Sequence, residues 1–316
     1  MLNSAQLQVG MLQDYYENKT NKTIIGRKKF VARKSPLERL MDLELYSSLD
    51  PNYITMLKQN FRSHSSLLTL PNRLFYSNML QPMAARSEND PLAKILVFEE
   101  IEGLKSTEIN KSRQGQSIEF CSIISEECRQ GKSPSYFNVK EVQMVLKYVQ
   151  ALTKLSFSNP DHKVLPEQIG VVTPYARQVH QIRDTLRCNK FQGVDVGTTE
   201  SFQGREKRVI IISTVRAKQD LLSYDKKYNL GFVKHEKRFN VAITRAMSKL
   251  IVIGCAHVLA TDDKWLSYIR ACEELNSFCG VPYPKRTEEI IDDITRRFEK
   301  LHVLDSQHND EIKAIQ

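Results

Sequence analysis

The sequence predicts an α/β fold in which a mostly parallel sheet is flanked by helices. Two observations carry this prediction. Apolar, largely β-branched runs at residues 209–215 and 250–254 are typical of strands that are buried on both faces of a parallel sheet. Between residues 169 and 254 such runs alternate with helical patterns, as they do in successive βαβ units.

Polar segments directly follow several of these apolar runs. They are Thr173-Pro174-Tyr175, the segment from Thr198 to Gly204, and Arg216. In open parallel sheets, ligands bind beyond the carboxyl ends of the strands. We therefore expect all three segments at one rim of the sheet.

Turn and cap signals place the flanking elements. Ser35-Pro36 followed by Glu38 predicts a helix start, since Pro suits the first helical position and this Glu completes a capping box. Residues 80–117 are irregular and charged, and no regular element is assigned to them. The other expected elements are a helix over 66–76 interrupted at Pro71, a strand over 117–124, a helix over 139–155 with Asn138 as N-cap, a strand over 169–172, and a helix over 176–186 with Pro174 in its first turn.

The last part of the chain is helical in pattern. Residues 256–276 predict one or two helices with Trp265 in the core. Residues 286–304 predict an amphipathic charged helix that either packs on the domain or binds a partner, and the residues after it are expected to be disordered. The expected division of the chain is a divergent basic leader or linker over 1–34, a folded domain over 35–284, and a charged helical or disordered tail over 285–316.

Composition bounds the class of protein. With 41% hydrophobic and 26% charged residues, it is that of an ordinary globular protein. No apolar run approaches the roughly 18–20 residues of a membrane span, and the start lacks a signal-peptide pattern, so we expect a cytoplasmic protein without a membrane span. The six cysteines show no Cys-x-x-Cys pair and no His at zinc-ligand spacing. This favours buried reduced thiols over disulfides or a metal site.

The net charge of +9 suggests a polyanionic partner, but its distribution weakens that inference. Residues 1–34 hold seven basic and two acidic residues, whereas residues 285–316 hold six basic and eight acidic residues. The folded part is therefore only mildly basic. Charge alone does not identify RNA as a partner.

Two arginines near the second apolar run suggest an anion ligand. In a helix starting near Glu236, Arg238 and Arg245 are seven residues apart and return to nearly the same face. A guanidinium donates hydrogen bonds in a planar fork that fits phosphate oxygens. Either arginine could therefore contact a phosphate.

Four motifs resemble those of a known family. Residues 200–207 (ESFQGREK) resemble motif V of superfamily-one helicases, and residues 238–246 (RFNVAITRA) resemble their motif VI. Residues 59–64 (QNFRSH) resemble the arginine motif that opens their second RecA-like domain, and residues 171–175 (VVTPY) resemble segment IVa. The four motifs occur in order across roughly 200 residues and are similar to those of the Armitage group of RNA helicases, the Moloney-leukaemia-virus-10-like branch of the 5′-to-3′ RNA helicases.

The resemblance implies a RecA-like P-loop NTPase fold, ATP as cofactor and single-stranded RNA as partner. It implies that Phe61 stacks on adenine, Glu206 binds the ribose, and Arg62 and Arg245 stabilise charge on the γ-phosphate. Without the resemblance, Phe61 would be interpreted as a core aromatic and Arg62 as part of a surface ion pair. The implied nucleotide-binding set is Phe61, Arg62, Gln203, Gly204, Glu206 and Arg245, and the implied RNA-binding set is Thr173, Pro174, Tyr175, Thr198 and Thr199.

Two motifs of a complete helicase are missing from the sequence. There is no Gly-x-x-x-x-Gly-Lys-Ser/Thr loop and no Asp-Glu pair at the end of an apolar strand. The first would hold the β- and γ-phosphates, and the second would hold Mg²⁺. We therefore expect a first RecA-like domain to supply both, the chain alone to be inactive, and no residue of this chain to bind a metal.

Two other interpretations stay open. The chain could be a non-catalytic product that binds RNA or silencing proteins without ATP turnover, which a continuous reading frame into a phosphate-loop domain upstream of residue 35 would argue against. It could also be an α/β domain that kept the fold and lost the site, although Arg62, Glu206 and Arg245 are all retained and none is needed for the core. A role in RNA silencing, small-RNA silencing proteins as partners, and ribonucleoprotein granules as location are implied only by the resemblance.

Overall fold

The computed structural model describes residues 40–47, 50, 52–104, 116–129, 131, 135–218, 232 and 236–284. The chain divides into two compact units, residues 1–281 and 282–316, and the elements below belong to the first. The helix start expected at Ser35-Pro36, the leader, and the helix expected over 286–304 lie outside the described residues.

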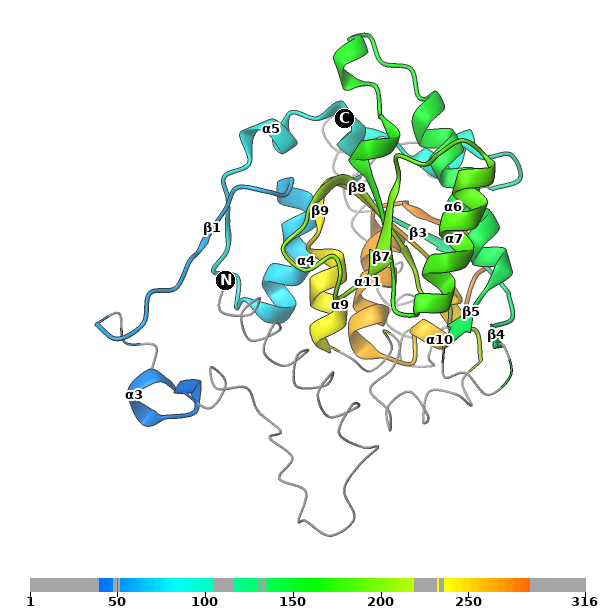
Figure 1. Ribbon diagram of the computed structural model, residues 1–316. Helices are drawn as coiled ribbons and strands as arrows, with labels where there is room; N and C mark the ends of the chain where they lie inside the picture. Colours follow the sequence, from blue (N-terminus) through cyan, green and yellow to red (C-terminus); the bar gives the residue numbers. More distant parts are fainter. Residues whose placement is uncertain are drawn as a thin grey trace, which may run out of the picture. The chain divides into compact units, whose positions relative to one another are not determined.

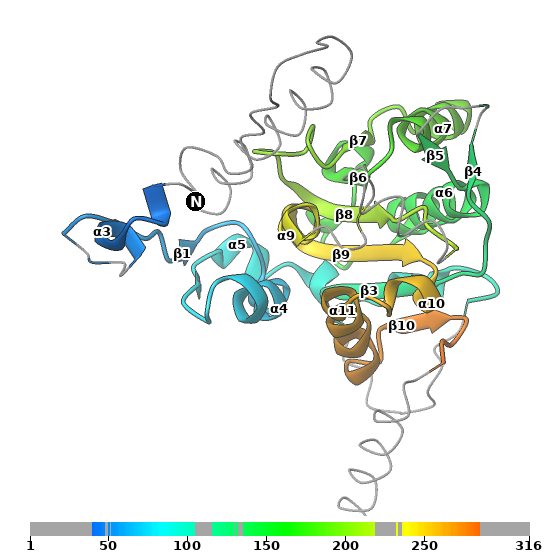
Figure 2. The same cartoon turned by 90° about the horizontal axis from the view of Figure 1, so that it is seen from below.

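A sheet of six parallel strands forms the centre of the first unit (Figure 1). Figure 2 shows the strands in the order β7, β6, β8, β9, β3, β10. The prediction of an α/β fold with a mostly parallel sheet is thereby confirmed. The strand bounds are β3 Ile118–Ser122, β6 Ile169–Thr173, β7 Asp195–Thr198, β8 Lys207–Ser213, β9 Ala246–Gly254 and β10 Phe278–Gly280.

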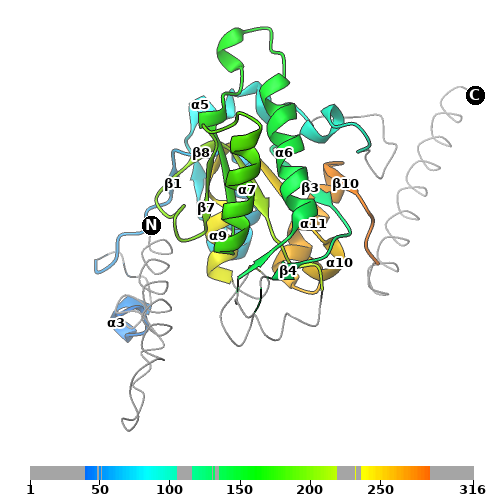
Figure 3. The ribbon, with the colours of Figure 1, turned by 45° about the vertical axis from the view of Figure 1, so that its right-hand side comes forward.

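Helices cover both faces of this sheet. On one face, α6 (Val139–Lys154) and α7 (Ala176–Cys188) lie side by side (Figure 3). Helix α4 (Ser65–Phe75) contacts β9, α11 (Asp263–Glu274) contacts β3, and α9 (Glu236–Ile243) packs on α4. The short elements are α3 Glu44–Ser47, β1 Gln59–Asn60, β2 Gln81–Pro82, α5 Ala85–Glu88, η1 Pro91–Lys94, η2 Val97–Glu100, β4 Cys128–Arg129, β5 Tyr136–Phe137, η3 Pro160–His162, η4 Pro166–Gln168 and α10 Ala256–Leu259.

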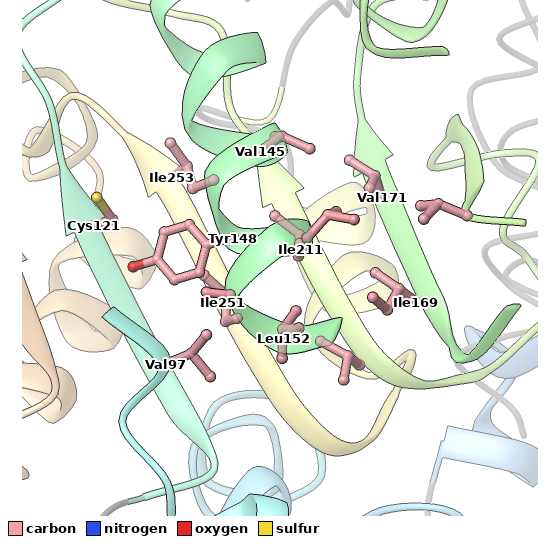
Figure 4. Close-up of a cluster of buried hydrophobic side chains, with 14 of the residues drawn as sticks. Val97, Cys121, Val145, Tyr148, Leu152, Ile169, Val171, Ile211, Ile251 and Ile253 are labelled. Carbon is pink, nitrogen blue, oxygen red and sulfur yellow. The ribbon is translucent and has the colours of Figure 1, made fainter. Parts of the chain in front are cut away.

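The strands are buried on both faces, as their apolar runs predict. Side chains alternate along a strand, so Ile211 and Ile251 face the cluster formed with α6 and α7, which Figure 4 shows around Tyr148. Ile210 and Val252 point to the other face and are equally buried. There the aromatic residues pack edge to face, with the Phe239 and Trp265 ring centroids 4.6 Å apart. The predicted core position of Trp265 is confirmed.

Residues 80–104, the described part of the irregular stretch over residues 80–117, belong to the core although they form only short elements. Their 3-10 turn η2 buries Val97 and Phe98 completely. Glu119 of β3 accepts hydrogen bonds from the backbone N of Val97, at 2.6 Å, and of Phe98, at 3.3 Å. The same carboxylate pairs with the fully buried Lys249 of β9 at 2.7 Å. Tertiary contacts therefore replace the periodicity that the sequence lacks here.

Three local predictions are wrong. Helix α4 continues through Pro71, because burial of Pro71 and the leucines around it outweighs one lost backbone hydrogen bond. Pro174 precedes its helix, since Tyr175 is the N-cap of α7. All six cysteines are free, but Cys128 and Cys188 are exposed, because they lie on a two-residue strand and at the end of a helix.

Candidate functional site

The segment from Asn60 to His64 is fixed at the first residues of β9. The Oδ1 atom of Asn60 accepts hydrogen bonds from the backbone N of Arg62 (3.0 Å) and of Ser63 (2.9 Å), which closes a tight turn. Ser63 Oγ donates to the carbonyl of Ala246 (2.8 Å), and His64 N donates to the carbonyl of Met247 (2.8 Å). The turn therefore holds the Arg62 side chain beside the start of this strand.

Arg62, Glu206 and Arg245 converge at this amino edge of the sheet. Arg62 Nε donates to the Glu206 carboxylate in an ion pair, and its Nη1 donates to the carbonyl of Thr244 at 3.3 Å. Arg245 Nε donates to the carbonyl of Val241 (3.0 Å), and its Nη2 donates to Thr244 Oγ1 (2.9 Å). Thr244 thus contacts both guanidinium groups.

Two guanidiniums and one carboxylate give this cluster an excess of positive charge. Arg245 is only 7% exposed. Burial, and after it the charge of Arg62, lower the pKa of Arg245 to about 10, although Tyr76 and Glu206 oppose the shift. Arg245 is still protonated at neutral pH, so the cluster is suited to an anion.

Phe61 and the turn before Glu206 complete the implied nucleotide-binding set. The Phe61 residue is 68% exposed, so it is not a core aromatic. Gln203 is half-buried. Gly204 has a φ of +77°, and a Cβ built there would meet no atom within 4 Å, so glycine is needed for the left-handed backbone rather than for space.

The expected pairing of Arg238 and Arg245 on one helical face is wrong. Helix α9 ends at Ile243, and Arg245 lies two residues beyond it. The helix stops because Thr244 Oγ1 donates back to the carbonyl of Asn240 (2.7 Å) while Arg245 Nε takes the carbonyl of Val241. Arg238 instead donates from Nε to Glu200 at 2.9 Å.

The implied RNA-binding set lies at the carboxyl ends of β6 and β7, where Thr173 pairs with Thr198 in the sheet. Thr173 and Thr199 are fully buried, and their hydroxyls have no hydrogen-bond partner among the described residues. Thr198 and Pro174 are half-buried. The ring of the buried Tyr175 packs edge-on against Tyr136, with centroids 5.8 Å apart.

The expectation that the whole segment from Thr198 to Gly204 lies at one rim is wrong. Strands β7 and β8 both run parallel to β6, so the chain must return from the carboxyl end of β7 to the amino end of β8. Arg205 already pairs with Asp195, the first residue of β7, at 3.2 Å. The two residue sets therefore lie at opposite edges, about 20 Å apart for a seven-residue strand rising about 3.3 Å per residue.

Comparison with known proteins identifies the family. A family model described as "AAA domain" matches residues 32–257. The chain belongs to this family. It is a helicase domain of the C-terminal region of superfamily-one helicases, which confirms the resemblance to the Armitage and Moloney-leukaemia-virus-10-like RNA helicases.

Three relatives illustrate the similarity. "Putative helicase MOV-10" of Gallus gallus is 36% identical over 282 residues, which cover 85% of this chain and 28% of the relative. "Probable RNA helicase armi" of Drosophila melanogaster is 33% identical over 263 residues, or 79% of this chain and 21% of the relative. An uncharacterized ATP-dependent helicase of Methanocaldococcus jannaschii is 31% identical over 227 residues, or 71% and 30%. The helicase domain thus spans between a fifth and a third of the length of these relatives.

Sequence reasoning missed one group of side chains in this helicase domain. Asn138, Glu141, Gln178 and Ser213 form a buried hydrogen-bonded network below the carboxyl edge of the sheet. In the sequence, Asn138 and Glu141 read only as an N-cap and a first-turn carboxylate, and nothing marks Glu141 as buried.

Within the described residues, no helix is both long and apolar enough to span a bilayer.

Proposed function

We propose that the chain is the second RecA-like half of an ATP-dependent RNA helicase. It binds adenine nucleotide at the amino edge of its sheet and single-stranded RNA at the carboxyl edge. The observation that supports this most is the convergence of Arg62, Glu206 and Arg245 next to the exposed Phe61. An anionic ligand would offset the excess positive charge of that cluster.

Each side chain of the cluster has a chemical task in this proposal. The exposed ring of Phe61 stacks on adenine. Arg245 Nη1 has no acceptor among the described residues and is available to a γ-phosphate oxygen. The turn at Gln203 and Gly204 lies two residues before Glu206, which binds the ribose.

Nucleotide binding in this proposal exchanges the partners of one ion pair. Arg62 Nε and the Glu206 carboxylate are bound to each other in the structure. The phosphate takes over Arg62 while a ribose hydroxyl takes over Glu206, so neither charge is left without a partner. The pair is partly exposed, at 27% for Arg62 and 45% for Glu206, and such pairs contribute only about 0–1 kcal/mol. The exchange is therefore inexpensive.

RNA contacts at the carboxyl edge are supported by unsatisfied hydroxyls. A buried polar group without a hydrogen bond costs roughly 1–3 kcal/mol, and Thr173 and Thr199 each carry one. A backbone phosphate oxygen would supply the missing acceptor once a local shift of this edge exposes the two hydroxyls. Tyr175 contributes by shaping this edge, since its ring is buried.

A further domain completes the site in this proposal. The described residues contain no group of three or more His, Cys, Asp or Glu side chains suited to a metal. The phosphate loop and the acidic pair that holds Mg²⁺ belong to a first RecA-like domain, where the ion would neutralise charge on the phosphates. The role in RNA silencing, with silencing proteins as partners, rests on the resemblance to the Armitage group.

ATP turnover with and without that domain tests the proposal. The chain alone is expected to hydrolyse ATP at background rate, whereas a fusion to the first RecA-like domain of a relative is expected to turn over ATP and to be stimulated by single-stranded RNA. Turnover by the chain alone that disappears in Arg245→Ala contradicts the proposal. A folded fusion that binds RNA and never turns over supports the non-catalytic alternative.

A further inference from the structure

A buried carboxylate lies under the carboxyl edge of the sheet with only neutral donors around it in the described structure. Glu141 of α6 is fully buried. It accepts hydrogen bonds from Ser213 Oγ (2.5 Å) and from the backbone N of Val215, which is 2.9 Å from each carboxylate oxygen. No Lys or Arg among the described residues pairs with it. A carboxylate in such a place needs a reason beyond helix capping.

Val215 supplies that reason. Its φ is +72°, a left-handed conformation that a β-branched residue rarely adopts because its side chain crowds the backbone. The N–H of Val215 donates to Glu141, and its carbonyl accepts from Asn138 Nδ2 at 3.1 Å. The strained residue is therefore held from both sides by two side chains at the start of α6.

The left-handed turn at Val215 directs the next residue into the protein. Arg216 is fully buried, with its guanidinium carbon 3.9 Å from the ring centroid of Tyr136 and 5.2 Å from that of Tyr175. Glu127 pairs with it at 3.6 Å. The side chain of Val215 packs in the same cluster as the two tyrosine rings.

The same network reaches the start of α7. Gln178 Nε2 donates to Ser213 Oγ (2.9 Å), and Gln178 Oε1 accepts from the backbone N of Asn138 (2.8 Å). Gln178 lies in the first turn of α7, directly after Thr173-Pro174-Tyr175. The end of β8 and the segment proposed to contact RNA are thus joined through Glu141 and Asn138.

We propose that Glu141 and Asn138 act as positioning residues that hold Val215 left-handed and thereby fix the segment 173–175 in its RNA-binding form. This rests on the proposed RNA contact at the carboxyl edge. Glu141→Gln retains the size of the side chain and weakens the grip on Val215 N. Glycine adopts the left-handed conformation without help, so Val215→Gly removes the need for the grip.

The test is whether Val215→Gly rescues Glu141→Gln. Binding of fluorescein-labelled single-stranded oligouridine is measured by anisotropy on the full chain, per folded molecule. Glu141→Gln is expected to bind about tenfold more weakly, the scale of one hydrogen bond, and the double variant Glu141→Gln/Val215→Gly is expected to return to within about threefold of wild type. Val215→Ala is the matched control, because it removes the branched side chain but keeps the left-handed strain, and it should not rescue. Glu167→Gln controls for the loss of a carboxylate elsewhere.

Hydrogen exchange of peptides covering 173–179 and 213–217 gives a second measurement that does not depend on RNA. Faster exchange of both peptides in Glu141→Gln, reversed by Val215→Gly, supports the proposed hold of Glu141 and Asn138 on Val215. This result is independent of RNA binding. A wild-type chain that binds no RNA refutes the RNA contact at the carboxyl edge instead. The proposal is overturned when the double variant binds RNA as weakly and exchanges as fast as Glu141→Gln. Ser213→Ala, which removes one donor to Glu141 and should behave in the same way, replaces Glu141→Gln where that variant does not fold.

Discussion

Replacing Arg245 by Lys separates a chemical role of this side chain from a structural one. Lys keeps the positive charge but loses the planar fork of the guanidinium. In the structure the fork makes two internal hydrogen bonds, to the carbonyl of Val241 at 3.0 Å and to Thr244 Oγ1 at 2.9 Å. Each is worth roughly 0.5–1.5 kcal/mol, so the variant should lose about 1–3 kcal/mol of stability and melt a few degrees lower.

The expected loss of turnover is much larger than this loss of stability. Charge builds on the equatorial oxygens during phosphoryl transfer, and a guanidinium placed there is worth about 10³ to 10⁵ in rate. The assay is RNA-stimulated ATP turnover of the fusion to a first RecA-like domain, with nucleotide binding and melting measured on the same samples. Arg187→Lys is the matched control, because Arg187 is exposed and pairs with Asp184 within its own helix.

A structural role alone predicts a different pattern. An Arg245 that only caps the end of α9 would give a variant that melts lower but turns over normally per folded molecule. The assignment to the γ-phosphate is refuted when Arg245→Lys binds ATP and RNA normally and still turns over within about threefold of wild type, a difference well under 1 kcal/mol in barrier.

Two further predictions concern RNA affinity and pH. Two to four phosphate contacts at about −0.7 each predict a log–log salt slope of roughly −1.5 to −3 for single-stranded RNA, and loss of all binding on deletion of residues 1–34 would assign binding to the basic leader instead. Burial raises the pKa of Glu141 to about 8 from its ordinary value of 4.5, so the folded chain keeps a proton that the unfolded chain releases. Stability should therefore fall as pH rises from about 4.5 to about 8, and Glu141→Gln should remove this loss. Urea unfolding at several pH values measures this difference. If the free energy of unfolding changes with pH equally in wild type and Glu141→Gln, the raised pKa of Glu141 is contradicted, because the nearby Cys255 and Glu127 are the same in both proteins.

The strands of this fold could be predicted because their signal is local. An apolar run such as Val209 to Ile212 is typical of a strand buried on both faces of a parallel sheet. Asn138 caps its helix by accepting a hydrogen bond from the backbone N of Glu141, three residues further along the chain. The edge of the sheet at which a strand-end residue lies also follows from chain direction. This is why Thr173 and Thr198 are found together.

Features set by distant contacts could not be predicted. The end of α9 depends on how Thr244 and Arg245 take its last carbonyls, which helical periodicity does not encode. The conformation of η2, within the stretch to which the sequence assigns no element, depends on Glu119, a residue of another element that binds the first turn of η2. In the sequence Glu141 looks like an ordinary first-turn carboxylate, because its contact with Ser213 of β8 exists only in the folded chain.

Arg62 combines two interpretations that the sequence treats as alternatives. It does form an ion pair near the surface, with Glu206, and it also lies beside Arg245 at the amino edge of the sheet. The pair keeps both charges satisfied while no phosphate is present, and its partial exposure makes it weak enough to be exchanged. A buried pair would be costly to open, because each ion would remain desolvated without its partner. The exposure of this pair is therefore the property that allows an ion pair and a phosphate contact to use the same arginine.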